Sequence, residues 1–390
     1  MSEVVLNDVC ELIVDCPHST AYDEGTGYPL VRTPNIGRGR IIYSGMHRVC
    51  EEVYNKRNAR AIPQTNDLIF AREATAGNVA LIQEGEKVCL GQRTVLIRPN
   101  ANLVNPAFLT YHLLAPEQQY KLLSTANGAT VAHVNMPTIR NLKLSLPPLA
   151  TQHRIATILS RYDSLIENYQ KQIKLLEEAA QRLYKEWFVD LRFPGHENTK
   201  IVDGVPEGWE KKRLIDLVDV QYGYAFDGKL FNSSGEGMPI LRIRNIPDGI
   251  TSDYTTEEAQ DCYIVHNGDI VVGMDGIFHI NSWSGGDAYL VQRACSFRPK
   301  EECMKGFIFQ AIQEPIKFFE KTLVGATVAH LGKKHIDSIE LCIPKNFELY
   351  KPFSKFYNQR QGLLSQIRLL TEARDRLLPK LMSGEINVES

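Results

Sequence analysis

The sequence lacks the motifs of most catalytic protein classes. Its 390 residues contain no G-x-x-x-x-G-K-[ST] phosphate loop, no G-x-G-x-x-G after a strand, no G-x-S-x-G elbow and no H-E-x-x-H motif. The Asn/Asp-Pro-Pro-Tyr/Phe tetrapeptide of amino-methyltransferases is missing too. Acidic pairs such as Glu207 and Glu210 lie too close in sequence to make a convincing nuclease site. We therefore expect no catalytic residue in this chain.

Cysteine pairs and long apolar runs are also missing. The eight cysteines are scattered, with no C-x-x-C pair and no flanking histidine at zinc spacing, so we expect reduced core residues and no metal site. No stretch approaches 18 uninterrupted apolar residues, and the N-terminus has no basic start followed by an apolar run. These absences predict a cytoplasmic protein without a membrane span.

The net charge of -2 excludes a uniformly basic nucleic-acid coat but permits a local basic patch. A hydrophobic content of 43% is enough to build real cores. A chain of this length should fold into two or three domains.

A stretch in the middle of the chain, residues 151–190, carries a heptad pattern without proline or glycine. A helix of about 40 residues would be roughly 60 Å long, so its apolar seam needs a second long helix to cover it. The seam consists of Ile155, Leu159, Tyr162, Ile166, Tyr169, Ile173, Leu176, Ala180, Leu183 and Trp187.

An identical hexamer indicates that the chain holds two copies of one unit. Residues 128–133 and 325–330 both read GATVAH, and the apolar positions that follow keep the same offset of 197 residues. Earlier landmarks match at drifting offsets, among them Gln92-Arg93 with Gln292-Arg293. The first copy has short β-type runs and one helical segment at residues 105–124, which is typical of a mixed α+β domain.

The long helix is duplicated too. Moved by 194 residues, its seam falls on positions 349–381, where eight of ten residues are apolar. We therefore predict an α+β fold with two tandem globular domains, separated by two long helices that pack as an antiparallel coiled coil with pseudo-two-fold symmetry. The predicted segments are a first domain (1–149), a central helix (150–190), a linker (191–206), a second domain (207–346) and a C-terminal helix (347–390).

Charged residues select the register of the helix pair. Facing positions of antiparallel helices have a constant sum of residue numbers. At a sum of 536, Arg374 faces Tyr162 and Arg360 faces Leu176. The next residues of the first helix, Asp163 and Glu177, then lie beside the two arginines. These arginines interrupt the second seam, and an unpaired buried charge would cost several kcal/mol. The sequence thus predicts that each arginine pairs with one of these acids.

Basic residues gather in one region of the first copy. Residues 32–60 hold seven basic side chains against two acidic ones, a local net charge of +5, interleaved with glycine and tyrosine. Such loops can approach a DNA backbone and aim arginine at base edges, although a solvated basic face would have the same composition. The candidates are Arg32, Arg38, Arg40, Arg48, Lys56, Arg57 and Arg60, with Arg72 beyond this segment.

Basic residues in the second copy are spread among acids. If both copies bind DNA, they should use different loops and read different sequences. The candidates are Lys229, Arg242, Arg244, His279, Lys333 and Lys334.

The hexamer histidines, His133 and His330, have two interpretations. Each either packs or caps a turn, or is presented to a ligand from the same loop of its copy. The duplication favours a structural role, because residues that read sequence should differ between copies that read different sequences.

The chain resembles the DNA-specificity subunits of type I restriction-modification systems over its whole length. The resemblance is carried by residues 146–149 (LPPL) with Gln152 and Ile155, the helix end at 182–195 (RLYKEWFVDLRFPG), 205–209 (VPEGW) and 377–384 (LLPKLMSG). It departs from the family pattern at Thr151, where an acid is common, and at Lys345, which replaces a proline.

The resemblance implies that each globular copy is a target-recognition domain reading one half of a split, asymmetric DNA sequence. It also implies that the helices space the half-sites and dock two methyltransferase subunits, which restriction subunits can join. S-adenosylmethionine, ATP and Mg²⁺ would belong to those partners and no cofactor to this chain. The residues alone leave two alternatives open, a stand-alone nuclease and a coiled-coil scaffold without a nucleic-acid role. The basic cluster and the duplicated domain signature argue against the scaffold.

Overall fold

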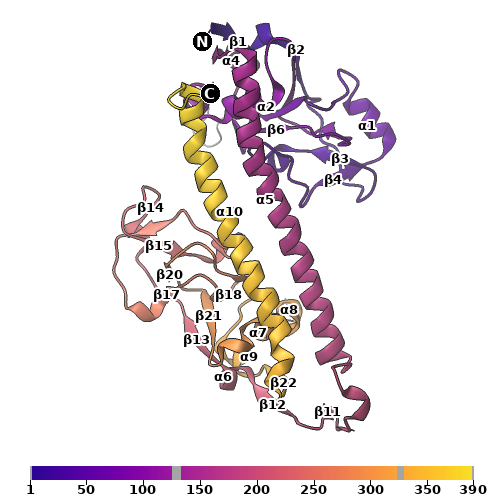
Figure 1. Ribbon diagram of the computed structural model, residues 1–390, viewed down its shortest axis with the longest axis vertical. Coiled ribbons are helices and arrows are strands. Elements are labelled where there is room, and N and C mark those ends of the chain that lie inside the picture. Colours follow the sequence, from indigo (N-terminus) through magenta and orange to yellow (C-terminus); the bar gives the residue numbers. More distant parts are fainter. Residues whose placement is uncertain (1, 125–132, 323–328, 389–390) are drawn as a thin grey trace. The chain divides into compact units, whose positions relative to one another are not determined.

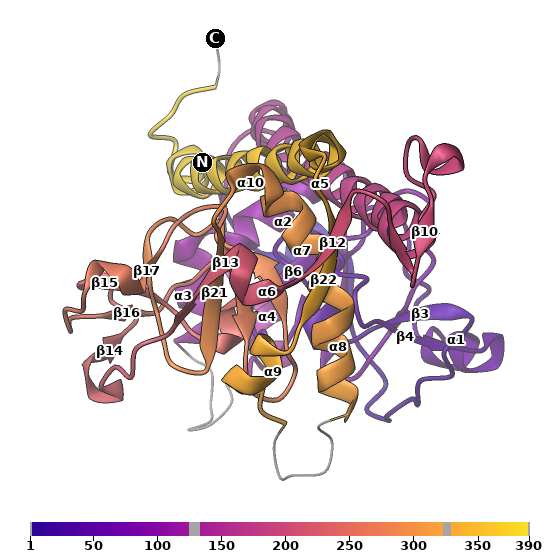
Figure 2. The same cartoon turned by 90° about the horizontal axis from the view of Figure 1, so that it is seen from below.

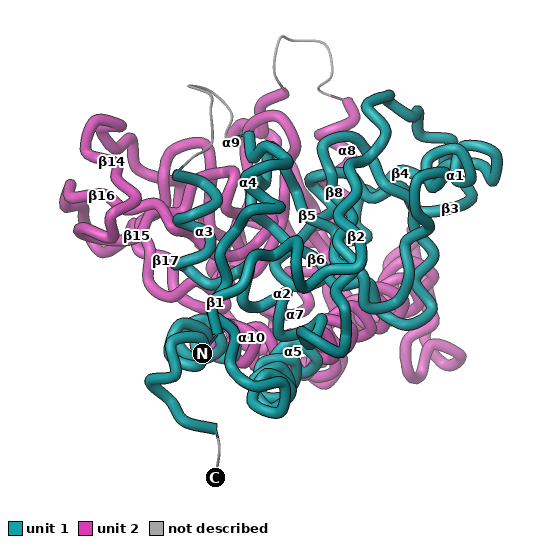
Figure 3. Tube along the Cα trace, turned by 90° about the horizontal axis from the view of Figure 1, so that it is seen from above, with its two compact units in different colours: residues 1–166, 370–390 teal, residues 167–369 magenta. Residues whose placement is uncertain are grey.

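The computed structural model describes residues 2–124, 133–322 and 329–388. The chain divides into two compact units: unit 1 comprises residues 1–166 and 370–390, and unit 2 comprises residues 167–369 (Figure 3). Each unit contains one globular copy and one part of each long helix (Figure 1). The compact units thus cut through both helices, whereas the predicted domains separate the helices from the globular copies.

Unit 1 is built on an antiparallel sheet with the strand order β2-β8-β5-β6. Its central strands are buried on both faces, which explains their continuous apolar runs. A smaller sheet has β3 antiparallel to β4 and parallel to β7, and β1 pairs with β9. The strands are β1 (Ser2–Val5), β2 (Cys10–Asp15), β3 (Tyr28–Val31), β4 (His47–Val49), β5 (Leu68–Ala71), β6 (Val79–Leu81), β7 (Cys89–Leu90), β8 (Thr94–Pro99) and β9 (Lys143–Leu146).

Short helices complete unit 1. They are α1 (Glu51–Arg57), α2 (Pro106–Leu114), α3 (Pro116–Leu123) and α4 (Met136–Arg140), with 3₁₀ turns η1 (Leu6–Val9) and η2 (Thr33–Asn35). The single helical segment predicted at 105–124 is two helices, because Pro116 lacks the N–H that an uninterrupted helix would use. Asn105 caps α2 by accepting a hydrogen bond from the Phe108 N–H.

Unit 2 repeats this plan. Its main sheet has the order β13-β21-β18-β19, a second sheet has the order β14-β16-β15-β20-β17, and β12 pairs with β22. The strands are β12 (Trp209–Arg213), β13 (Val218–Tyr222), β14 (Phe231–Asn232), β15 (Met238–Leu241), β16 (Tyr254–Thr255), β17 (Ile264–Val265), β18 (Ile270–Gly273), β19 (Ile280–Ser282), β20 (Ala288–Leu290), β21 (Ala294–Pro299) and β22 (Glu340–Pro344). A hairpin of β10 (Ile201–Val202) and β11 (Val205–Pro206) precedes them.

The helices of unit 2 are α6 (Leu214–Leu217), α7 (Lys305–Ala311), α8 (Gln313–Thr322) and α9 (Lys333–Asp337). In chain order, the last three correspond to α2, α3 and α4 of the first copy, and α6 stands where the first copy has η1. Figure 2 shows α7 and α8 beside the strands of this unit. The 3₁₀ turns are η4 (His196–Asn198), η5 (Gly228–Leu230), η6 (Ile243–Asn245), η7 (Asp261–Tyr263), η8 (Glu302–Met304) and η9 (Phe347–Tyr350).

The strand pairings confirm the tandem repeat. The parallel pair of β3 with β7, where Leu30 lies opposite Cys89, corresponds to that of β15 with β20, where Ile240 lies opposite Tyr289. The pair of β1 with β9 corresponds likewise to that of β12 with β22. Two stretches with little identity outside the hexamer therefore share one topology.

The long helices are α5 (Leu149–Tyr184), which a π-helical turn η3 (Lys185–Val189) continues, and α10 (Lys351–Ser383). In unit 1, Ile155 and Leu159 of α5 share a buried cluster with Leu378 and Leu381 of α10. In unit 2, Phe353 of α10 belongs to the core of the globular copy. Within each unit the helix seam thus joins the core of that unit's own domain.

Two arginines of α10, the buried Arg360 and the half-buried Arg374, are paired with acids of α5. In unit 1, Arg374 Nη1 lies 2.7 Å from Asp163 Oδ1, and the Tyr111 hydroxyl donates to Oδ2 of the same carboxylate. Burial, together with the Asp163 charge, raises the pKa of Tyr111. In unit 2, Arg360 Nε lies 2.6 Å from Glu177 Oε1, and the same guanidinium donates to side chains of β19. These are the two pairs that a register sum of 536 predicts.

Removing Asp163 should destabilise unit 1. Asp163→Ala should lower the free energy of unfolding by about 3–5 kcal/mol, because Arg374 and Tyr111 would lose their shared buried acceptor. Urea denaturation measures the change. The matched control is Glu178→Ala, which removes an exposed helix pair with Arg182 at 3.9 Å and should cost about 0.5 kcal/mol or less. Equal effects of both substitutions would show that the buried pair does not stabilise the fold.

Candidate nucleic-acid interface

Most of the predicted basic residues of the first copy lie at the surface. Arg38, Arg48, Lys56 and Arg60 are exposed, and Arg32 and Arg40 are half-buried. Several are anchored at one nitrogen by a backbone carbonyl: Arg48 Nη1 donates to Gly27 O at 2.7 Å, and Arg60 Nη1 donates to Asp15 O at 3.0 Å. An exposed guanidinium held this way keeps its other N–H groups directed toward solvent, where they could bond an anion.

Arg57 is a structural residue. It is only 5% exposed, and its three nitrogens donate to the carbonyls of Leu90, Ser19 and Pro17. Burial lowers the pKa of its guanidinium. The expectation that Arg57 contacts DNA does not suit this position, because the side chain is enclosed by the loops it holds together. The sequence could not reveal this, since its partners come from segments far away in the chain.

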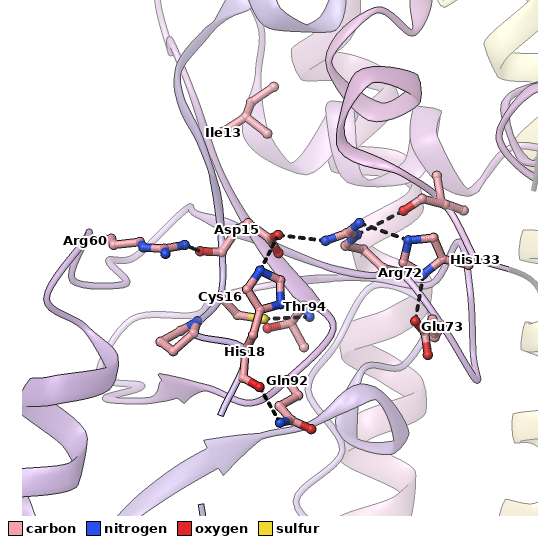
Figure 4. Close-up of polar contacts among 12 residues, drawn as sticks. Ile13, Asp15, Cys16, His18, Arg60, Arg72, Glu73, Gln92, Thr94 and His133 are labelled. Atoms are coloured by element: carbon pink, nitrogen blue, oxygen red, sulfur yellow. Dashed lines mark hydrogen bonds and ion pairs between the residues drawn. The ribbon is translucent and has the colours of Figure 1, made fainter. Parts of the chain in front are cut away.

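Arg72 is enclosed in the same way, directly after β5 (Figure 4). Its Nε donates to the carbonyl of Val134 at 3.0 Å, Nη1 lies 2.7 Å from Asp15 Oδ2, and Nη2 lies 3.0 Å from His133 Nε2. A guanidinium can only donate, so the His133 Nε2 is the acceptor in this contact. Arg72 therefore holds strands and turns together and is unsuited to contact DNA.

The carboxylate of Glu73 joins two further residues of the first copy. Its Oε1 lies 2.7 Å from His133 Nδ1, and its Oε2 lies 2.6 Å from Arg93 Nη1. The acid is mostly buried, whereas the Arg93 side chain is 61% exposed. These three residues form the first acid–histidine–arginine cluster.

The second copy contains the same cluster. Asp275 Oδ1 lies 2.5 Å from His330 Nδ1, and Asp275 Oδ2 lies 3.2 Å from Arg293 Nη1. The acid is again mostly buried, and the Arg293 side chain is 69% exposed. Each hexamer histidine thus pairs with an acid just after the corresponding strand, β5 or β18, which favours the structural role over presentation to a ligand.

Both arginines of these clusters have left-handed backbone. The φ angles are +64° at Arg93 and +71° at Arg293. A non-glycine residue held there costs about 1–3 kcal/mol, and an ion pair of a largely exposed side chain stabilises by only about 0.2–1 kcal/mol. The ion pair therefore does not offset the strain of the backbone. The sequence predictions missed these arginines as site residues, although the repeated Gln-Arg dipeptide was visible.

The basic candidates of the second copy are dispersed. Lys229, Lys333 and Lys334 are exposed, and His279 is half-buried. Arg244 pairs with Asp253 through three nitrogen–oxygen contacts of 2.6, 2.7 and 3.2 Å. The guanidinium carbon of Arg242 lies 5.4 Å from the centre of the Phe231 ring.

Across residues 2–124, 133–322 and 329–388, no group of three or more His, Cys, Asp or Glu side chains is placed to hold a metal ion. Nor is any helix in these ranges long and apolar enough to cross a membrane.

Comparisons with known proteins agree with the resemblance seen in the sequence. The profile of a family described as the type I restriction modification DNA specificity domain matches residues 1–178 and 206–368. The chain is 26% identical to the type I restriction enzyme MjaIX specificity subunit of Methanocaldococcus jannaschii, covering 98% of the chain and 93% of that protein. It is 24% identical to the HindI specificity subunit of Haemophilus influenzae, covering 75% of the chain and 80% of that protein.

A solved structure has the same fold. The crystal structure of the type I restriction-modification system S subunit from M. genitalium matches with a TM-score of 0.55 at 17% identity, covering 97% of this chain and 95% of that one.

Proposed function

Because the chain belongs to the type I restriction-modification DNA specificity family, as a specificity subunit, we propose that each globular copy reads one half of a bipartite, asymmetric DNA site. The observation that carries this proposal is the duplication. Two domains of one topology stand in one chain, and their candidate DNA-binding loops differ in sequence and charge. Two domains with different DNA-binding loops suit a DNA site whose two halves differ in sequence.

The long helices are proposed to set the gap between the half-sites and to dock two methyltransferase subunits. In support, both helices expose leucines at their surface: Leu165 is 39% exposed, Leu175 is 65% exposed and Leu369 is 56% exposed. Exposed apolar side chains on a helix surface suit a protein partner. Methyl transfer from S-adenosylmethionine and ATP- and Mg²⁺-dependent cleavage are assigned to such partners, and not to this chain.

The function is tested by the DNA that the assembled enzyme methylates. The chain is produced together with a methyltransferase subunit encoded beside it, and the methylated adenines of a host genome lacking other such enzymes are sequenced. We expect one asymmetric motif with two specific parts and an unspecified gap. A continuous motif would contradict two independent readers. Methylation by the chain alone would contradict the assignment of catalysis to a partner.

The exposed basic residues of the first copy are expected to contact DNA. Replacing Arg38, Arg48, Lys56 and Arg60 by alanine in the assembled methyltransferase should weaken binding. It should also lower the slope of log Kd against log salt by about 0.9 for each lost phosphate contact. The measurement is a titration with duplex DNA at several salt concentrations. Substituting Lys211 and Arg213, exposed basic residues outside the candidate set, removes two charges elsewhere and shows how much the slope depends on charge away from this surface. An unchanged slope in the fourfold variant would remove this surface from the interface.

A further inference from the structure

The two acid–histidine–arginine clusters are held by equivalent pairs of backbone hydrogen bonds. In the first copy the Arg72 N–H donates to Arg93 O at 2.9 Å, and the Val134 N–H donates to Arg72 O at 2.9 Å. In the second copy the Met274 N–H donates to Arg293 O at 2.8 Å, and the Leu331 N–H donates to Met274 O at 2.7 Å. The clusters therefore occupy the same place in the fold, and their likeness is not a coincidence of composition.

The residues around the clusters differ between the copies. Where Arg72 binds Asp15 and His133 in the first copy, the second copy has Met274, which has no charge and belongs to its hydrophobic core. The residue after the acid is Ala74 in the first copy and Gly276 in the second, both with positive φ. The acid, the histidine and the arginine are thus kept while the immediate surroundings change.

The exposed arginine is the part of each cluster that can bind a partner. Each guanidinium places one nitrogen on its acid, and its other nitrogens make no hydrogen bond to any residue that the structure describes. A guanidinium fixed at one corner and open at the others is arranged to donate two parallel bonds to a phosphate. The acid has both oxygens engaged, one by the arginine and one by the histidine, so it directs the arginine outward.

From this arrangement we propose that Arg93 and Arg293 each bind one backbone phosphate of DNA, in the two half-sites respectively, and that Glu73 and Asp275 are positioning residues. The proposal rests on the proposed function as a two-domain DNA reader. Residues that are identical in both domains cannot be the reason why the two domains read different sequences. A phosphate is the same at every step of the duplex, so it is the part of DNA that a duplicated contact can recognise.

The test measures binding by the chain assembled with its methyltransferase subunits. The DNA probes are a random-sequence duplex and a duplex carrying the motif found by methylation sequencing. The variants are Arg93→Gln, Arg293→Gln and the double substitution. Arg93→Lys and Arg293→Lys retain the charge at the same positive-φ positions. Arg213→Gln is the matched control, since Arg213 is also an exposed arginine paired with an acid, Asp216.

Each glutamine substitution should weaken binding to both duplexes by a similar factor, roughly tenfold, and lower the salt slope by about 0.9, with the double variant near twice that loss. The lysine variants and Arg213→Gln should keep the wild-type slope, and the methylated motif should not change. Unchanged slopes in the glutamine variants would overturn the phosphate contacts, as would an altered motif. Failure of the wild-type complex to bind either duplex would instead overturn the proposed function.

Discussion

Exchanging residues 209–344 for the same segment of a related specificity subunit should change one half of the methylated motif and leave the other half intact. The cuts suit the structure because Trp209 and Pro344 lie opposite each other at one end of the pair β12 and β22. The exchanged piece therefore begins and ends at neighbouring points, and it contains the two larger sheets of unit 2. Sequencing of methylated adenines gives the result directly.

The reciprocal exchange is the matched control. Ser2 lies opposite Leu146 at the corresponding end of β1 and β9, so residues 2–146 form the equivalent piece of unit 1. Exchanging them should change the other half of the motif. If either exchange altered both halves, the copies would not read independently and the central argument from duplication would fail.

The sequence repeat made the topology predictable, but it did not predict the contacts of single side chains. An identical hexamer and a constant offset identified two copies, and a duplicated sequence must fold into a duplicated strand order. Arg57 shows where composition misleads: it belongs to the most basic stretch of the chain, yet its partners are backbone carbonyls at positions 17, 19 and 90. Net charge in a window does not indicate which arginines the fold encloses.

The acid–histidine–arginine clusters were hidden for a similar reason. Their members come from three separate segments, at positions 73, 93 and 133 in the first copy, and no spacing rule joins them. The repeat was the available signal, because Arg93 and His133 both recur at matching positions. The heptads were more informative, since a helix has one fixed period and its charged interruptions restrict the register.

Cysteines introduced at Ile173 and Leu363 should form an intramolecular disulfide on oxidation. The sequence register places these residues opposite each other at facing seam positions, where Cα atoms come close enough for a disulfide. The ion pairs Asp163–Arg374 and Glu177–Arg360 each join residues whose numbers sum to 537, one away from the seam sum of 536. Within unit 2, Leu363 and Leu176 also line one groove. Both observations support the same register.

This experiment requires replacement of the exposed native cysteines only, so the hydrophobic core is left unchanged. The exposed Cys50, Cys262 and Cys303 are replaced by serine, while the other five stay: the buried Cys16, Cys89 and Cys295 and the half-buried Cys10 and Cys342. Burial raises the pKa of Cys89 to about 11, so its thiol remains protonated and slow to oxidise at neutral pH. Peptide mapping by mass spectrometry then identifies which sulfurs are joined.

A cysteine pair one heptad out of register is the control. Phe356 lies one heptad, roughly 10 Å along the helix, from the position that faces Ile173. Cysteines at positions 173 and 356 should therefore stay reduced under the same conditions. Because a disulfide needs Cα atoms within about 7 Å, the two outcomes are mutually exclusive for a rigid helix pair. A bond from position 173 to 356, with none to 363, would place the register one heptad away. The ion pair between Arg360 and Glu177 would then not determine the register.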